Sequence, residues 1–177
     1  MTTLTTEQRR TDFEAMLKRA DLARATMPPC RTALTETGGP LALIARDVSE
    51  LCAAWAESAY RARTHKPSDQ AQARARIVAA RCLLLLDDIG VTDPVKEVVD
   101  ASVDEALGPL TWREDLYVPA VERIGRLLAY LGDVAENYDC GTGEGCRLVL
   151  RDVTALLAAK AVCAALAADR GLWQEAS

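Results

Sequence analysis

A chain of 177 residues is long enough to bury one continuous hydrophobic core without metal ions or disulfides to hold it together. Its formal net charge is −5, and its arginines alternate with acids, which excludes the concentrated basic face that nucleic-acid binding requires. Hydrophobic residues make up 50% of the chain and aromatic residues only 5%, because alanine and leucine dominate, and this balance favours helices over strands.

The N-terminal residues lack a basic region followed by an apolar stretch, so we expect no secretory signal. No segment reaches the roughly 20 apolar residues of a membrane span, and the segment nearest to one, 153–168, contains Lys160. We therefore expect a cytoplasmic protein that does not bind membranes. Because arginine is strongly preferred to lysine and alanine is abundant, we expect a GC-rich bacterial source such as an actinobacterium.

Proline, glycine and capping residues divide residues 1–177 into six helices with no strand between them. In chain order, we expect helices at about 6–26, 40–64, 69–89, 94–107, 112–138 and 144–169. The first begins with a capping box at Thr5 and Gln8 and ends before Pro28. The sequence thus predicts an all-α fold, a single-domain bundle of about six helices without a sheet.

Three of the later helices carry further signals. The second places Leu41, Ile44, Val48, Leu51 and Trp55 at alternating three- and four-residue steps, which is a heptad pattern. Asp93 and Pro94 are typical of the cap and first position of the fourth helix, and Thr111 with Glu114 forms a capping box before the fifth, where Pro119 introduces a kink or a later start.

Several classes of catalytic and metal site are excluded by composition. His65 is the single histidine, so di-iron bundles and most zinc hydrolases lack their ligands, and its place at a helix end favours a capping role. The six cysteines contain no CxxC pair, and we expect them to be reduced, with pairing of Cys140 and Cys146 left open. The glycine loop at 141–145 lacks the lysine of a phosphate-binding loop. We expect no metal and no cofactor.

Carboxylates three residues apart are typical of magnesium sites in all-helical nucleotide pyrophosphohydrolases. Three such pairs occur: Asp47 with Glu50, Glu97 with Asp100, and Asp133 with Glu136. At about 100° per residue, each pair lies largely opposite the apolar side of its helix, whereas a magnesium site needs carboxylates that converge. We interpret them as solvated faces and keep a magnesium-dependent pyrophosphohydrolase as the weakest hypothesis.

Four charged residues lie on faces that should be apolar. Arg74, Arg81 and Asp88 recur every seven residues on the third helix, and Lys160 shares an apolar stripe of the sixth. Because an unpaired buried charge costs several kcal/mol, we expect these groups to pair, to reach solvent, or to line a cavity. In the last case Arg81, Lys160 and Arg74 would bind an anionic ligand, and Lys160 or Asp88 would be the catalytic candidate.

Two functions are compatible with this pattern. The first is a helical interaction protein that forms a homo- or hetero-oligomer, such as an accessory protein of bacterial specialised metabolism, because the sixth helix is apolar on all sides and Leu172 and Trp173 extend it. The second is a small enzyme or anion-binding protein with a pocket around Lys160, Arg81 and Asp88. The expected partner is accordingly a second copy, another protein subunit or a small anionic molecule.

Overall fold

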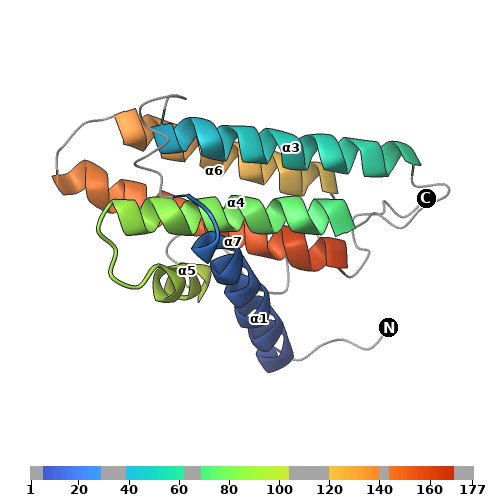
Figure 1. Ribbon diagram of the computed structural model, residues 1–177, viewed down its shortest axis with the longest axis horizontal. Coiled ribbons are helices and arrows are strands. Elements are labelled where there is room, and N and C mark those ends of the chain that lie inside the picture. Colours follow the sequence, from blue (N-terminus) through green and yellow to red (C-terminus); the bar gives the residue numbers. More distant parts are fainter. Residues whose placement is uncertain (1–5, 29–38, 62–68, 104–119, 140–143, 170–177) are drawn as a thin grey trace.

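A computed structural model describes residues 6–28, 39–61, 69–103, 120–139 and 144–169 (Figure 1). These residues form α1 (Thr6–Ala25), α3 (Gly39–Arg61), α4 (Asp69–Asp88), α5 (Pro94–Val103), α6 (Ala120–Asp139) and α7 (Glu144–Asp169). No strand occurs within the described ranges, and the predicted all-α helical bundle is confirmed.

The predicted boundaries agree with the helices that are described. The helices expected at 6–26, 69–89 and 144–169 match α1, α4 and α7 to within one residue, and α3 and α5 begin within one residue of their predicted starts. The predicted ends of α3 and α5 and the range 112–119 lie outside the described residues. So do Thr5, His65, Thr111, Glu114, Pro119, Cys140, the loop at 141–143, Leu172 and Trp173, and nothing is described of the Trp55 and Cys146 side chains.

The six helices are stacked in three layers of two (Figure 1). Helices α3 and α6 form one outer layer, α4 and α7 form the middle layer, and α1 and α5 pack on the far side of α4 and α7. Within the first two layers each helix runs antiparallel to its neighbours, so that α3, α4, α7 and α6 form a closed four-helix arrangement. Helix α1 crosses this bundle obliquely.

Helix α7 is the central element of the core. Its contacts are with α1, α4, α5 and α6, and every residue from Thr154 to Ala168 is buried. Alanine is the commonest residue in that stretch, and its small side chain lets neighbouring helices approach from several directions. The apolar surface that the sequence shows all round this helix is therefore buried within the chain itself, and it leaves no excess for a partner in this part of the molecule.

The heptad face of α3 is also buried. Ile44, Val48 and Leu51 belong to the same core cluster as Phe13 of α1 and Leu157 of α7. This face therefore packs against the protein's own helices, mainly α4, and does not form a seam for another chain. Of the helices that the structure describes, none combines the length and the apolar character that spanning a membrane would need.

The connection between α4 and α5 is a tight, hydrogen-bonded turn. Gly90 has a φ of 92°, a left-handed conformation that glycine adopts without strain, and its amide donates to the Asp87 carbonyl at 3.0 Å. The Val91 amide donates to the Leu86 carbonyl at 2.9 Å, which completes a Schellman motif. Asp93 then caps α5 as predicted, because its Oδ1 accepts a hydrogen bond from the Lys96 amide at 3.0 Å.

Candidate functional site

A buried ion pair joins α3 and α4 in the four-helix part of the fold. The Nε of Arg81 donates to Oδ2 of Asp47 at 2.8 Å, and the side chains are only 11% and 3% exposed. Arg46, which is largely exposed, donates to the other carboxylate oxygen at 3.1 Å. The expectation that Asp47 lies on a solvated face was wrong, because α4 covers that side of α3 and brings Arg81 onto it.

A second arginine of α4 repeats the pattern two turns away. Arg74 donates to Glu50 of α3, and both side chains are partly exposed. Arg74 and Arg81 thus share the α3-facing side of α4, in keeping with their predicted seven-residue spacing. Within the described residues, Nη1 of Arg81 is buried without a hydrogen-bond partner. These contacts give both arginines a structural role as partners of α3 carboxylates, while a role in ligand binding stays a prediction.

The ion pair of Asp47 with Arg81 involves neither Lys160 nor Asp88. Lys160 is only 6% exposed, and its Nζ lies 5.9 Å from the ring centroid of Tyr130 on α6, within the range of a cation–π contact. Asp88, at the end of α4, is half-buried. Lys160 contacts α6, whereas Arg81 contacts α3. These contacts therefore give no evidence that the two cations bind the same ligand.

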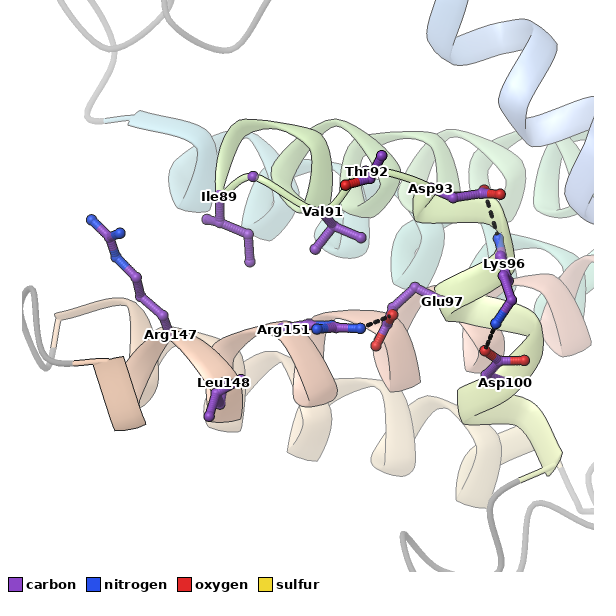
Figure 2. Close-up of a pocket in the computed structure, with 11 residues that line it drawn as sticks. Ile89, Val91, Thr92, Asp93, Lys96, Glu97, Asp100, Arg147, Leu148 and Arg151 are labelled. Atoms are coloured by element: carbon purple, nitrogen blue, oxygen red, sulfur yellow. Dashed lines mark hydrogen bonds and ion pairs between the residues drawn. The ribbon is translucent and has the colours of Figure 1, made fainter.

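A pocket of about 380 Å³ lies elsewhere, between the α4–α5 connection, α5 and the first turns of α7 (Figure 2). Such a volume is within the usual range of small-molecule sites. Its lining comprises residues 89–93 of the connection, Lys96, Glu97 and Asp100 of α5, and Arg147, Leu148 and Arg151 of α7. Glu97 and Asp100, one of the carboxylate pairs noted in the sequence, are part of this lining, whereas Arg74, Arg81, Asp88 and Lys160 are not.

Most charges of this pocket are paired with one another. Arg151 donates to Glu97, and Lys96 pairs with Asp100 (Figure 2). The hydrogen bond to Glu97 raises the pKa of the Arg151 guanidinium, although its partial desolvation acts in the opposite direction. The Glu97 side chain is only 16% exposed, so the expectation that it faces water was wrong: α7 packs over α5 and covers it.

One signal in the sequence points to this pocket. Arg147 and Arg151 are one helical turn apart in the first two turns of α7, at the end of a helix where the macrodipole disfavours cations. Arg151 is offset by Glu97, whereas Arg147 forms no hydrogen bond or ion pair among the described residues. Two basic residues at a helix N-terminus are therefore a signal from which this pocket could have been predicted from the sequence.

The outer surface of α6 forms a third feature, which we call the α6 face: Gly125, Leu128, Ala129 and Gly132. All four residues are exposed, Leu128 to 48%. A Cβ placed on Gly125 or Gly132 would meet nothing within 4 Å. By contrast, the exposed side of α1 carries Arg10, Glu14, Lys18 and Arg19. The exposed side of α1 is therefore largely charged, with Leu22 as an exception, whereas the α6 face consists of small and apolar residues.

The thiol of Cys82 on α4 is predicted to be unreactive in the folded protein. Burial raises the pKa of this thiol far above its ordinary value, and the nearby charge of Asp47 acts in the same direction. Because the thiolate is the nucleophile, we expect Cys82 to be alkylated by iodoacetamide only after unfolding in urea. Peptide mass spectrometry of the native and unfolded protein measures this, and rapid native alkylation of Cys82 would show that the α3–α4 contact opens.

No protein family, curated protein or solved structure matches this chain. The chemistry of the described residues thus provides the grounds for a function. No three His, Cys, Asp or Glu side chains in the described ranges are grouped to hold a metal ion. Asp47, Glu50, Glu97 and Asp100, which sequence spacing singled out as two carboxylate pairs, each bind an arginine or lysine instead.

Proposed function

We propose that this protein is a non-catalytic helical protein that associates with a second copy of itself through the α6 face. The observation that carries the proposal is the exposed strip of Gly125, Leu128, Ala129 and Gly132 on an outer helix. Small residues let two helix backbones approach closely, and Leu128 supplies apolar area that water would otherwise cover. Most of the apolar surface of α7 and α3 is already buried within the chain, with Leu148 and Val149 in the first turns of α7 as exposed exceptions.

Charge along α6 favours a second copy over an unrelated partner. Arg126 and Asp133 flank the strip on the same side of the helix, because seven residues correspond to about two turns. If two α6 helices pack antiparallel about a twofold axis level with Ala129 and Tyr130, residue 126 of each lies opposite residue 133 of the other. Each Arg126 then faces an Asp133, so the pairing creates two attractive contacts at the edge of the strip.

The engaged carboxylates support a binding role over catalysis. A magnesium-dependent hydrolase needs carboxylates that converge on a cation, but Asp47 and Glu97 are directed to arginines of the neighbouring helix. Breaking these pairs to bind a metal would leave Arg81 buried without its counterion. The same pairing already engages Arg81, whose availability for an anionic substrate was the motivation for an enzyme at that position.

The test is the oligomeric state in solution. We expect sedimentation equilibrium to give twice the mass of one chain at micromolar concentration, and Ala129→Glu to give the mass of a single chain, because the two carboxylates would be buried against each other at the twofold axis. The matched control is Ala15→Glu, an exposed alanine on α1, which should remain a dimer. A monomeric wild-type protein at high concentration would contradict the proposal.

Charge reversal tests the geometry of the pairing. We expect Arg126→Asp to weaken the dimer, since it places two aspartates opposite each other, and Asp133→Arg to do the same with two arginines. The double variant restores opposite charges in exchanged positions, so it should recover dimerisation. If the double variant associates no better than the single variants, α6 does not pair antiparallel with its copy.

A further inference from the structure

The pocket between α4, α5 and α7 lies on the other side of the molecule's middle layer from α3, and its chemistry differs from that of the α6 face. We propose that this pocket binds a small organic monocarboxylate with a compact apolar body. The proposal does not rest on self-association, because no residue of the α6 face lines the pocket.

The walls of the pocket are held in place before any ligand enters. The connection that forms one wall is fixed by the Schellman motif at Gly90 and by the Asp93 cap. The opposite wall belongs to α7, which is joined to α5 by the ion pair of Arg151 with Glu97. A preformed site loses little conformational entropy on binding, which favours a specific ligand even in a shallow pocket.

The partners of the charged side chains in the lining indicate the sign of the charge on the ligand. Asp93 caps α5 through one oxygen and is exposed to water, Asp100 binds Lys96, and Glu97 binds one terminal nitrogen of Arg151. The Nε of Arg151 is buried and lacks a hydrogen-bond partner in the described structure. Arg147, one turn earlier on α7, is exposed and forms no ion pair with the described residues. The uncommitted donors are therefore cationic N–H groups, which match an anion.

The total charge of the lining limits that anion to a single negative charge. Lys96, Arg147 and Arg151 are balanced by Asp93, Glu97 and Asp100, so three positive and three negative groups cancel. A carboxylate can neutralise Arg147 while staying away from the acids on α5. A nucleotide or another polyanion would bring additional negative charges close to those acids, and the described lining residues include no further unpaired cation to offset them.

Apolar residues between the charged groups of the pocket indicate that the rest of the ligand is apolar. Figure 2 shows Ile89 and Val91 extending from the connection toward α7, between Arg147 on one side and the Glu97–Arg151 pair on the other. Leu148 of α7 is also part of the lining and is 55% exposed, although its side chain points away from Ile89 and Val91 in Figure 2. Covering these side chains removes apolar area from water, so the ligand carries an apolar body next to its carboxylate.

The proposal is tested by titrating the protein with sodium benzoate in a calorimeter. We expect saturable binding of benzoate, and binding weaker by at least about tenfold for benzyl alcohol, which lacks the charge, and for inorganic phosphate, which lacks the apolar body. No detectable benzoate binding by the wild-type protein, or phosphate binding as tight as that of benzoate, would overturn the assignment.

Variants locate the site. Arg147→Ala should weaken benzoate binding by at least about tenfold without lowering the thermal unfolding midpoint, since it removes from a helix N-terminus a cation that has no ion-pair partner among the described residues. Leu148→Ser should also weaken binding, whereas Arg19→Ala, an exposed arginine of α1, should leave it unchanged. Equal affinity of wild type and Arg147→Ala would place benzoate elsewhere. The Ala129→Glu variant should bind benzoate normally, so a failure of the dimer proposal remains distinguishable from a failure of this one.

Discussion

Replacing Asp47 with alanine is expected to lower the free energy of unfolding by about 3–5 kcal/mol, because the substitution leaves Arg81 nearly buried without its counterion. The carboxylate accepts hydrogen bonds from Arg81 at 2.8 Å and from Arg46 at 3.1 Å, and its own side chain is almost inaccessible to water. Losses of this size are a large part of the stability of an ordinary domain. Urea denaturation followed by circular dichroism measures the change.

The control for this substitution lies one turn along the same helix. Glu50 also binds an arginine of α4, but its side chain and that of Arg74 are partly exposed, so Glu50→Ala should cost no more than about 1 kcal/mol. The double variant Asp47→Ala with Arg81→Met removes both charges and places a flexible apolar side chain in the gap. We expect it to be more stable than Asp47→Ala alone. Equal losses for Asp47→Ala and Glu50→Ala would contradict the assignment of a buried pair.

The Asp47–Arg81 pair also shows which part of the arrangement could not be predicted from the sequence. The spacing of Arg74 and Arg81 correctly indicated one face of α4, and the cost of burying a charge correctly indicated that each would find a partner. The partner could not be identified, because the periodicity of a single helix says which side a residue is on but not which helix covers that side. Asp47 was placed on a water-exposed face for that reason.

The fold itself could be predicted closely, since its signals are local. Asp93 with Pro94 marks the start of α5, and the predicted cap forms in the structure. The pocket could not be predicted in the same way. It requires the first turns of α7 to meet the turn at Gly90 and one side of α5, and α7 lies many residues further along the chain. Only the arginines at the N-terminus of α7 gave a local sign of it.

Helix α7 gives a related correction to the functional argument. Its apolar character on all sides indicated a surface for another chain, but α1, α4, α5 and α6 surround it. An apolar helix in a sequence is compatible with both a central and an interfacial position, and the number of helices available to cover it decides between them. The case for self-association consequently moves from α7 to α6, whose exposed strip has no cover within the described chain.

The central position of α7 leads to the second large effect, a contrast between two leucines of that helix. Leu157 is 0% exposed and Leu148 is 55% exposed. Leu157→Ala should lower the free energy of unfolding by about 2–5 kcal/mol, because the lost transfer free energy is accompanied by a cavity among neighbouring helices that cannot all collapse into it. Leu148→Ala makes the same chemical change in the same helix and should alter stability by no more than about 0.5 kcal/mol.

Comparison of these two variants separates burial from helix propensity, because both replace leucine by alanine within α7 and so share any gain in propensity. Urea denaturation of both proteins at one concentration, below that at which the wild type associates, removes the contribution of a dimer. A loss confined to Leu157→Ala establishes α7 as the centre of the core. A comparable loss from Leu148→Ala would instead show that Leu148 is as well packed as Leu157 within the single chain, which would contradict the central position assigned to the 154–168 part of α7.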